Sequence, residues 1–354
     1  MNSMPCKTII FTHFLFFKYT YNFKTILLFF AMNYKQQFTT IQSKPVLVIG
    51  DVMVDTYIWG NVDRISPEAP VPVVSVTHTE HRLGGAANVV KNLSALGLQP
   101  IICTVIGNDE AGNTMRNLLL ESGVSDEHCI IHNQRKTTVK TRILSGNHQI
   151  LRVDNEQTNS ISPELTAEIC KKIQKLLTSK KIAAIVFQDY DKGVITKELI
   201  DFVTKFAHKY NIPIFVDPKK RNFLYYNSTT LFKPNFKEFT EGIGKQCKKQ
   251  DIEHVYILAK EFMLKHSIEM IMITLSEHGI FIANQHNYTH IPSQVRHVAD
   301  VSGAGDTVIS TAIACFLAQL PIEEIARISN IAAGLACEQP GVVTITLEQL
   351  STHI

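Results

Sequence analysis

The feature that most constrains the fold is a series of short, wholly apolar runs that alternate with helix-like segments. The apolar runs are VLVIG (46–50), IICTVIG (101–107), IAAIVF (182–187), IPIFVD (212–217) and IEMIMITLS (268–276). The segments 84–97 and 111–123 each end at a glycine, and 196–210 is amphipathic, as is typical of surface helices. Strands that are apolar throughout and alternate with helices predict an α/β fold, with a mostly parallel sheet covered on both faces.

Polar residues stand at the ends of several of these predicted strands. Asp51 and Asp189 follow two of the apolar runs, Asp217 ends a third, and a turn follows Thr274. Ligands of open parallel sheets bind beyond the carboxyl ends of the strands. We therefore expect a binding site along this edge of the sheet.

Two segments depart from this pattern, at about residues 57–83 and 135–154. Both alternate apolar and polar residues, which is typical of half-exposed antiparallel strands. They predict a small β-sheet that stands off the main body as a lid.

Composition limits the classes of function. The chain has 354 residues, 45% hydrophobic and 19% charged, with a formal net charge of +3. This balance fits a folded protein and argues against nucleic acid as a partner. The seven cysteines include no C-x-x-C pair, which indicates free thiols in a reducing, cytoplasmic environment. The pairs His78/His81 and His286/His290 lack a third ligand nearby, so a zinc site is disfavoured.

The beginning of the chain differs from the rest. Residues 1–31 are rich in Phe, Tyr and Ile, but Lys18 and Lys24 interrupt them, and the run 26–32 is too short to span a bilayer. We expect residues 1–43 to be a disordered or artefactual extension without stable membrane insertion, and Met32 to be the functional start. Residues 44–354 are expected to form the main domain.

The stretch DVSGAGDTVIS (300–310) reads as a tight turn that opens a helix. Gly303 and Gly305 allow backbone angles that other residues avoid, and an uninterrupted apolar run follows. The N–H groups at a helix N-terminus favour an anion, and Asp306 would lie beside it in the first turn. A carboxylate next to an anion site suits phosphoryl transfer to a hydroxyl. The alternative is an ordinary glycine-rich helix start in which Asp306 is only a cap.

Several motifs together resemble the PfkB, or ribokinase-like, carbohydrate kinases. They are the glycine pair with Asn88, the N-x-x-E pattern of KPNFKEF (233–239), and GAGD (303–306). The strings RISPEAPVPV (64–73) and QDYDKG (188–193) resemble the heptose-phosphate kinases of ADP-heptose synthesis, although Gln188 stands where that subfamily more often has a serine. The resemblance covers about 44–350. It implies a ribokinase-like three-layer sandwich with a small β-sheet lid.

The resemblance also implies roles for individual residues. Asp306 would be the catalytic base, and the amides of Gly303, Ala304 and Gly305 would hold the charge on the transferred phosphoryl group. ATP and Mg²⁺ would be bound by the N-x-x-E motif, with Glu238 acting on Mg²⁺ through water, and by the loop after Thr274. The expected nucleotide-side residues are Asn235, Phe236, Lys237, Glu238, Thr274, Ser276, Gly279 and Asn330.

The expected substrate contacts are Asp51, Gly84, Gly85, Asn88, Asp189 and Lys192. Lys140, Arg142 and Arg152 lie in the predicted lid and would bind a phosphate on the substrate, because Arg suits bidentate phosphate contacts. Purely structural roles remain as alternatives. Asp51 could be a cap or turn residue, Asn88 a buried helix residue, Asn235 and Glu238 a helix start, and the lid cations a solvated strand face.

The resemblance implies an ATP-dependent kinase for the anomeric hydroxyl of D-glycero-D-manno-heptose 7-phosphate. The nucleotidyltransferase half of the bifunctional heptose enzyme is expected to be a separate protein, because no H-x-G-H motif occurs. A homodimer through the lid is also expected. The alternatives are another sugar or sugar-phosphate kinase, of ribokinase or 1-phosphofructokinase type, and a sugar-binding regulator without catalysis. A dehydrogenase is disfavoured, because G-x-G does not follow the first strand.

Overall fold

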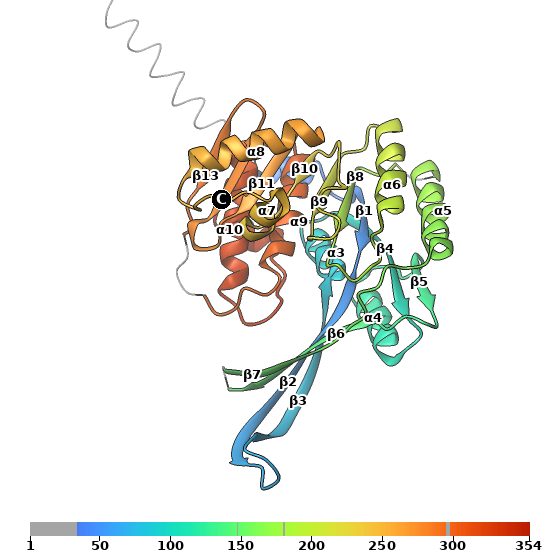
Figure 1. Ribbon diagram of the computed structural model, residues 1–354, viewed down its shortest axis with the longest axis vertical. Helices are drawn as coiled ribbons and strands as arrows, with labels where there is room; N and C mark the ends of the chain where they lie inside the picture. Colours follow the sequence, from blue (N-terminus) through green and yellow to red (C-terminus); the bar gives the residue numbers. More distant parts are fainter. Residues whose placement is uncertain (1–33, 147, 180, 295–297) are drawn as a thin grey trace, which may run out of the picture.

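The main body of the protein is a three-layer α/β/α arrangement around one large sheet (Figure 1). The computed structural model describes residues 34–146, 148–179, 181–294 and 298–354. Within these residues the large sheet has nine strands, in the order β13 (Tyr288–Ile291), β12 (Ile280–Asn284), β11 (Met270–Thr274), β10 (Leu231–Phe232), β9 (Ile214–Asp217), β8 (Ala184–Gln188), β1 (Pro45–Gly50), β4 (Gln99–Gly107) and β5 (Cys129–His132). Neighbouring strands from β11 to β5 are parallel, and β12 and β13 are antiparallel. The predicted fold class is confirmed.

Alternate residues of each strand pack into separate cores on the two faces of the sheet. In β1, for example, Val46 and Val48 join one hydrophobic cluster and Leu47 and Ile49 join the other. A strand buried on both faces needs apolar residues at every position. This requirement explains the continuous apolar runs in the sequence.

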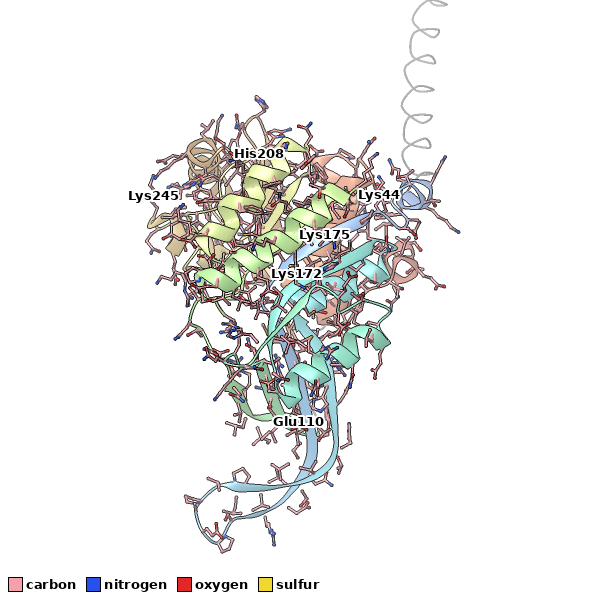
Figure 2. The ribbon with its side chains drawn as sticks, turned by 90° about the vertical axis from the view of Figure 1, so that its right-hand side faces the viewer. Lys44, Glu110, Lys172, Lys175, His208 and Lys245 are labelled. Atoms are coloured by element: carbon pink, nitrogen blue, oxygen red, sulfur yellow. The ribbon has the colours of Figure 1, made fainter. Side chains whose placement is uncertain are left out.

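Helices cover both faces. The first cluster receives α3 (Ala86–Ala95), α4 (Glu110–Glu121), α9 (Ala304–Leu317), α10 (Ile322–Cys337) and α11 (Leu347–Ser351). The second receives α5 (Pro163–Ser179), α6 (Lys197–Lys209), α7 (Phe236–Ile243) and α8 (Ile252–His266). Figure 2 shows α5 and α6 lying side by side across this second face, with Lys172 and Lys175 labelled on α5. A short 3₁₀ helix, η1 (Ser276–His278), follows β11.

A second, four-stranded sheet forms the lid and projects from the body (Figures 1 and 2). Its strands are β3 (Pro72–Gly85), β2 (Val52–Ile65), β6 (Thr138–Ser145) and β7 (His148–Asn155), in that order. The hairpins β2–β3 and β6–β7 are antiparallel, as predicted, and β2 joins β6 in parallel. The predicted segments 57–83 and 135–154 fall on these strands and the loop before β6, although β2 begins five residues earlier, directly after Asp51.

The residues just before β1 belong to the folded body. Helix α2 (Tyr34–Thr39) and the following turn place Phe38 and Ile41 in the core, both with no exposed surface. Tyr34 also contacts helix α10, where its hydroxyl donates to Glu324 Oε2 at 2.5 Å. Residues 34–43 therefore pack against the main domain rather than forming part of a disordered extension. The expectation for residues 1–31 lies outside the described residues.

Within the described part of the chain, none of the helices combines the length and the apolar character that crossing a bilayer requires.

Candidate active site

A cleft of about 710 Å³ opens at the carboxyl ends of β9, β10 and β11, beside the N-terminus of α9. The structure brings eight of the predicted residues together in its wall: Asn235, Glu238, Thr274, Ser276, Gly279, Asn330, Ala304 and Gly305. These residues come from four separate parts of the chain. The cleft lies where ligands of parallel sheets are expected to bind.

Two of the predicted nucleotide-side residues point elsewhere. Phe236 is partly buried and packs against the second hydrophobic cluster. The side chain of Lys237 is 82% exposed and lies 3.8 Å from Glu241, one helical turn away. Both residues start helix α7, so their neighbours Asn235 and Glu238 reach the cleft from the same turn while these two do not.

The turn before α9 adopts the predicted conformation. Gly303 is its N-cap, with φ of 79°, in the left-handed region that favours glycine. A side chain there would also meet Asn88 Nδ2, because a Cβ would lie 2.9 Å from this atom. Ala304 N donates weakly to Val301 O at 3.3 Å. The N–H groups of Gly305 and Asp306 have no acceptor among the described residues, so they can donate to an anion.

Asp306 lies in the first turn of α9, as predicted, and is 2% exposed. Three side chains donate hydrogen bonds to its carboxylate: Asn88 Nδ2 to Oδ2 at 2.7 Å, and Tyr190 OH and Gln188 Nε2 to Oδ1 at 2.8 and 3.0 Å. Burial raises the pKa of Asp306 to about 7, against the lowering effect of the bonds from Asn88 and Tyr190. A carboxylate with a pKa near neutrality can accept a proton from a hydroxyl and release it again.

Asp51 lies outside the wall of this cleft. It is 1% exposed and accepts three backbone N–H bonds, from Tyr190, Lys192 and Val194, at 2.9 to 3.0 Å. These bonds hold the loop 190–194 that follows β8. In this structure Asp51 therefore anchors the loop that carries Tyr190 and Lys192, which is close to the turn role left open by the sequence.

Asp189 is likewise buried and engaged with the protein. Its Oδ2 accepts from Asn222 Nδ2 and from Tyr226 OH, both at 2.9 Å. Burial, together with the neighbouring charge of Asp51, raises its pKa to about 7. Through these two bonds Asp189 connects the start of the same loop to Asn222 and Tyr226. Lys192, on that loop, pairs with Glu156 at 2.8 Å.

The glycine pair joins the lid to the body. Gly84 pairs with Met53, and a side chain at Gly84 would collide with the carboxylate of Asp55. Gly85, with φ of 60°, is the N-cap of α3, which presents Asn88 to Asp306. The pair thus allows β3 to pass close to Asp55 and turn at once into the helix that contacts Asp306.

The three predicted lid cations project from one face of the lid. Arg142 pairs in register with Tyr57 and with Arg152, and Lys140 pairs with Asp55, two residues along the same strands. This face, here called the inner face, looks toward the body, since Tyr57 OH accepts from Val342 N at 3.1 Å and Lys140 Nζ lies 5.8 Å from the ring centre of Tyr190.

The three cations differ in their partners. Arg142 is 8% exposed and is paired with Asp55 at 2.5 Å. Arg152 is paired with Asp154 at 2.9 Å. Lys140 has no carboxylate within ion-pair distance among the described residues, and burial lowers its pKa. Lys140 is therefore the lid cation most available to a ligand.

Four residues of the site were absent from the predicted set. Asp217 and Lys233 form a buried ion pair of 3.0 Å in the cleft wall, Lys219 pairs with Glu238, and Tyr190 reaches Asp306. Lys233 Nζ would lie 3.6 Å from a Cβ placed on Gly305, which puts this cation beside the anion-binding turn. Two features of the sequence could have pointed to these residues: Asp217 lies at the end of a strand, and Lys233 lies two residues before Asn235.

The donor set of the cleft suits a magnesium ion that is held mainly by phosphates and water. No cluster of three or more His, Cys, Asp or Glu residues occurs in the described part of the chain. Glu238 lines the cleft, although its two oxygens contact Lys219 and, in a capping box, the N–H of Asn235. Mg²⁺ usually keeps several waters and needs only one or two protein carboxylates beside substrate phosphates. Glu238 and Asp217 supply that number.

A turn with free N–H groups, a buried carboxylate of raised pKa and a strand-end cleft together suit phosphoryl transfer to a hydroxyl. The sequence model of the pfkB family carbohydrate kinases matches residues 43–349, so the chain belongs to this family and is a phosphotransferase that acts on a sugar hydroxyl.

Known proteins support this assignment. The chain is 38% identical over 311 residues to the "Bifunctional protein HldE" of Aliarcobacter butzleri, and 39% identical over 302 residues to that of Trichlorobacter lovleyi. These alignments cover 88% and 85% of this chain, but only 64% and 60% of the relatives' length.

Among solved structures, the chain is similar to phosphofructokinase-2 from Escherichia coli, with a TM-score of 0.71 and 17% identity over 88% of this chain and 97% of that one. It is also similar to the ribokinase of Arabidopsis thaliana, with a TM-score of 0.67 and 16% identity over 88% and 98%. These similarities confirm the ribokinase-like fold.

Proposed function

We propose that this protein transfers the γ-phosphoryl group of ATP to the anomeric hydroxyl of D-glycero-D-manno-heptose 7-phosphate. The observation that carries the choice of a phosphorylated sugar is the row of cations on the inner face of the lid. Lys140, Arg142 and Arg152 lie opposite a body site that already has an anion-binding turn and a base. A neutral sugar would leave Lys140, which has no carboxylate within ion-pair distance among the described residues, without an anionic partner. The heptose itself rests on the resemblance of residues 64–73 and 188–193.

In the proposed reaction, the sugar hydroxyl gives its proton to Asp306 as its oxygen attacks the γ-phosphorus. A new O–P bond forms, the bond from phosphorus to the ADP oxygen breaks, and ADP leaves. The free N–H groups of Gly305 and Asp306 and the ammonium of Lys233 would stabilise charge on the transferred group. Asn88, Gln188 and Tyr190 would orient the carboxylate.

Mg²⁺ would be held near Glu238 and Asp217, through water, and would neutralise charge on the ATP phosphates. The nucleotide would occupy the part of the cleft formed by Thr274, Ser276, Gly279 and Asn330.

Three further parts of the proposal concern the surroundings of the enzyme. The outer face and tip of the lid expose Ile65, Val71, Val76, Leu151 and Val153, each between 48% and 61% exposed, and we assign this surface to a homodimer contact. The free cysteines agree with a cytoplasmic location. A separate nucleotidyltransferase would then use the heptose 1,7-bisphosphate after removal of a phosphate.

The test is kcat/KM with ATP and Mg²⁺ against heptose 7-phosphate, fructose 6-phosphate, fructose 1-phosphate and ribose. We expect the heptose phosphate to have the highest kcat/KM of the four, and to exceed ribose by at least about tenfold, since ribose carries no phosphate and a fitted phosphate contact is worth more than about 1.4 kcal/mol. A higher kcat/KM for ribose would contradict the lid argument. A higher value for a fructose phosphate would retain the sugar-phosphate class and refute the heptose.

A further inference from the structure

Gln188, the last residue of β8, occupies a position between two carboxylates of the site. Its side chain is fully buried, and its Nε2 lies 3.0 Å from Asp306 Oδ1 and 3.0 Å from Asp217 Oδ2. A side-chain amide nitrogen carries two hydrogens, so one can be donated to each carboxylate. Its Oε1 has no hydrogen-bond partner in the described part of the chain.

The backbone around Gln188 is fixed on both sides. Its strand pairs with β1, where Gln188 is opposite Gly50, and with β9, where it is opposite Asp217. A Cβ on Gly50 would overlap Gln188 O, so the two strands approach too closely for any other residue at position 50. A side chain on such a backbone has few alternatives, and a buried amide that loses one acceptor leaves a donor unpaired.

Asp217 connects this amide to a cation. Its Oδ2 accepts from Gln188 and also lies 3.0 Å from Lys233 Nζ, in a pair with side chains only 6% and 3% exposed. Lys233 in turn lies beside the turn at Gly305. Gln188 thus links the carboxylate that would take the proton to the cation that would face the phosphoryl group.

We propose that Gln188 is a positioning residue that holds Asp306 and Asp217 apart and fixes the base relative to Lys233. The inference rests on the proposed function and deepens it. Without the donor to Asp306 Oδ1, the charged form of Asp306 would lose a buried hydrogen bond, and this carboxylate would favour its protonated form more strongly. Asp306 would then be available as a base only at higher pH.

Several charged and titratable groups face Asp306. They are Asp217 at the end of β9, Lys219 just after it, Lys233 after β10 and Tyr190 in the loop after β8. Of these four groups, Asp217 is the one that adds negative charge as long as Tyr190 keeps its proton. Burial raises the pKa of the Tyr190 phenol well above its ordinary value.

The experiment compares Gln188→Met, which keeps the volume and removes both donors, with Gln188→Glu, which in its acid form donates one hydrogen. The control is Gln174→Met, on the exposed face of α5. The pH dependence of kcat/KM for the sugar phosphate is measured for each full-length variant, together with KM for ATP and the melting temperature.

For Gln188→Met we expect the acid limb of the profile to move up by about one pH unit. This shift corresponds to a roughly tenfold loss of kcat/KM at pH 6.5, and the loss becomes smaller toward pH 9. Gln188→Glu should move the limb in the same direction, and Gln174→Met should leave it unchanged. KM for ATP should stay within about twofold. A loss of the same factor at every pH, or an unchanged limb in both variants, would overturn the inference.

A failure of the underlying function gives a different result. If Asp306 is not the base, the wild-type acid limb persists in Asp306→Asn, whatever Gln188 does. If Gln188→Met does not fold, Gln188→Glu carries the test, because it preserves the shape of the side chain.

Discussion

Asp306 is the residue on which the proposed reaction depends, and its conservative replacement separates catalysis from a structural role. Asp306→Asn keeps the shape of the side chain, and the N-cap of α9, Gly303, is unchanged. It removes the group that accepts the proton, so kcat should fall by about 10²–10⁴-fold. Steady-state kinetics together with the melting temperature give the test. A purely structural Asp306 would lose almost no rate on this change, so near-normal turnover in this variant would refute the mechanism.

The burial of Asp306 also predicts a pH dependence. Its pKa in the folded protein is raised to about 7, so the carboxylate is largely protonated below that pH and cannot act as a base. We expect kcat/KM for the sugar to fall about tenfold per pH unit below about pH 7 and to level off above it. Initial rates between pH 5.5 and 9 check this expectation. A profile that stays flat down to pH 5.5 would show that another group takes the proton.

The residues of the site differ in how far the sequence predicted them. Asp306, Asn235 and Glu238 lie in short motifs, and the structure places each of them at the site as expected. The role of Asp51 could not be predicted, because its three N–H partners lie about 140 residues further along the chain. Tyr190 and Lys233 were missed for the same reason: their partners are brought together only by the sheet.

At the scale of elements, the structure of the lid predicts that replacing Lys140 and replacing Arg142 will have different consequences. Lys140 has no ion-pair partner among the described residues, whereas Arg142 is paired with Asp55 in a buried position. Lys140→Ala should raise KM for the sugar phosphate several-fold and leave KM for ATP and the melting temperature nearly unchanged. Arg142→Ala should also raise KM for the sugar phosphate, and should destabilise the protein by about 3–5 kcal/mol, because Asp55 loses its partner.

Kinetics with varied sugar phosphate and varied ATP, and thermal unfolding of both variants, provide the measurements. Arg152→Ala is the matched control for the unfolding measurement, because the Arg152 side chain is 51% exposed and its ion pair should contribute little to stability. Equal effects of Lys140→Ala on both KM values would place the lid cation on the nucleotide side instead.

Helix α2 predicts where the chain can be shortened. A chain that begins at Met32 keeps Phe38 and Ile41, whereas one that begins at Lys44 loses both of these fully buried side chains. Each such side chain contributes roughly 1.5–3 kcal/mol. The chain that begins at Lys44 should therefore unfold at a clearly lower denaturant concentration. The chain that begins at Met32 should match the full-length protein in kcat and in unfolding midpoint. Equal midpoints for all three would show that α2 contributes nothing to the fold.

At the scale of the whole molecule, local pattern predicted the layers of the fold but left the order of the strands open. Wholly apolar strands such as β1 and β8 require cover on both faces, which determines the three layers. The central position of β1 depends on its pairing with β4 and β8, whose residues Pro100 and Ala184 both lie opposite Val46 although they are far along the chain. The apolar pattern of a single strand does not indicate which strands will be its neighbours. The lid was predictable as alternating strands, but its parallel joint between β2 and β6 was not.

The central proposal is that the whole molecule places a phosphoryl group on the anomeric oxygen of a sugar that already carries a phosphate. Phosphorus and proton NMR of the product of heptose 7-phosphate, ATP and Mg²⁺ tests it most directly. We predict one equivalent of ADP and a new phosphorus signal coupled to the anomeric proton, with the 7-phosphate intact, and neither product with Asp306→Asn. A phosphate on any other carbon, or no transfer to this sugar while another sugar is phosphorylated, would contradict the proposal.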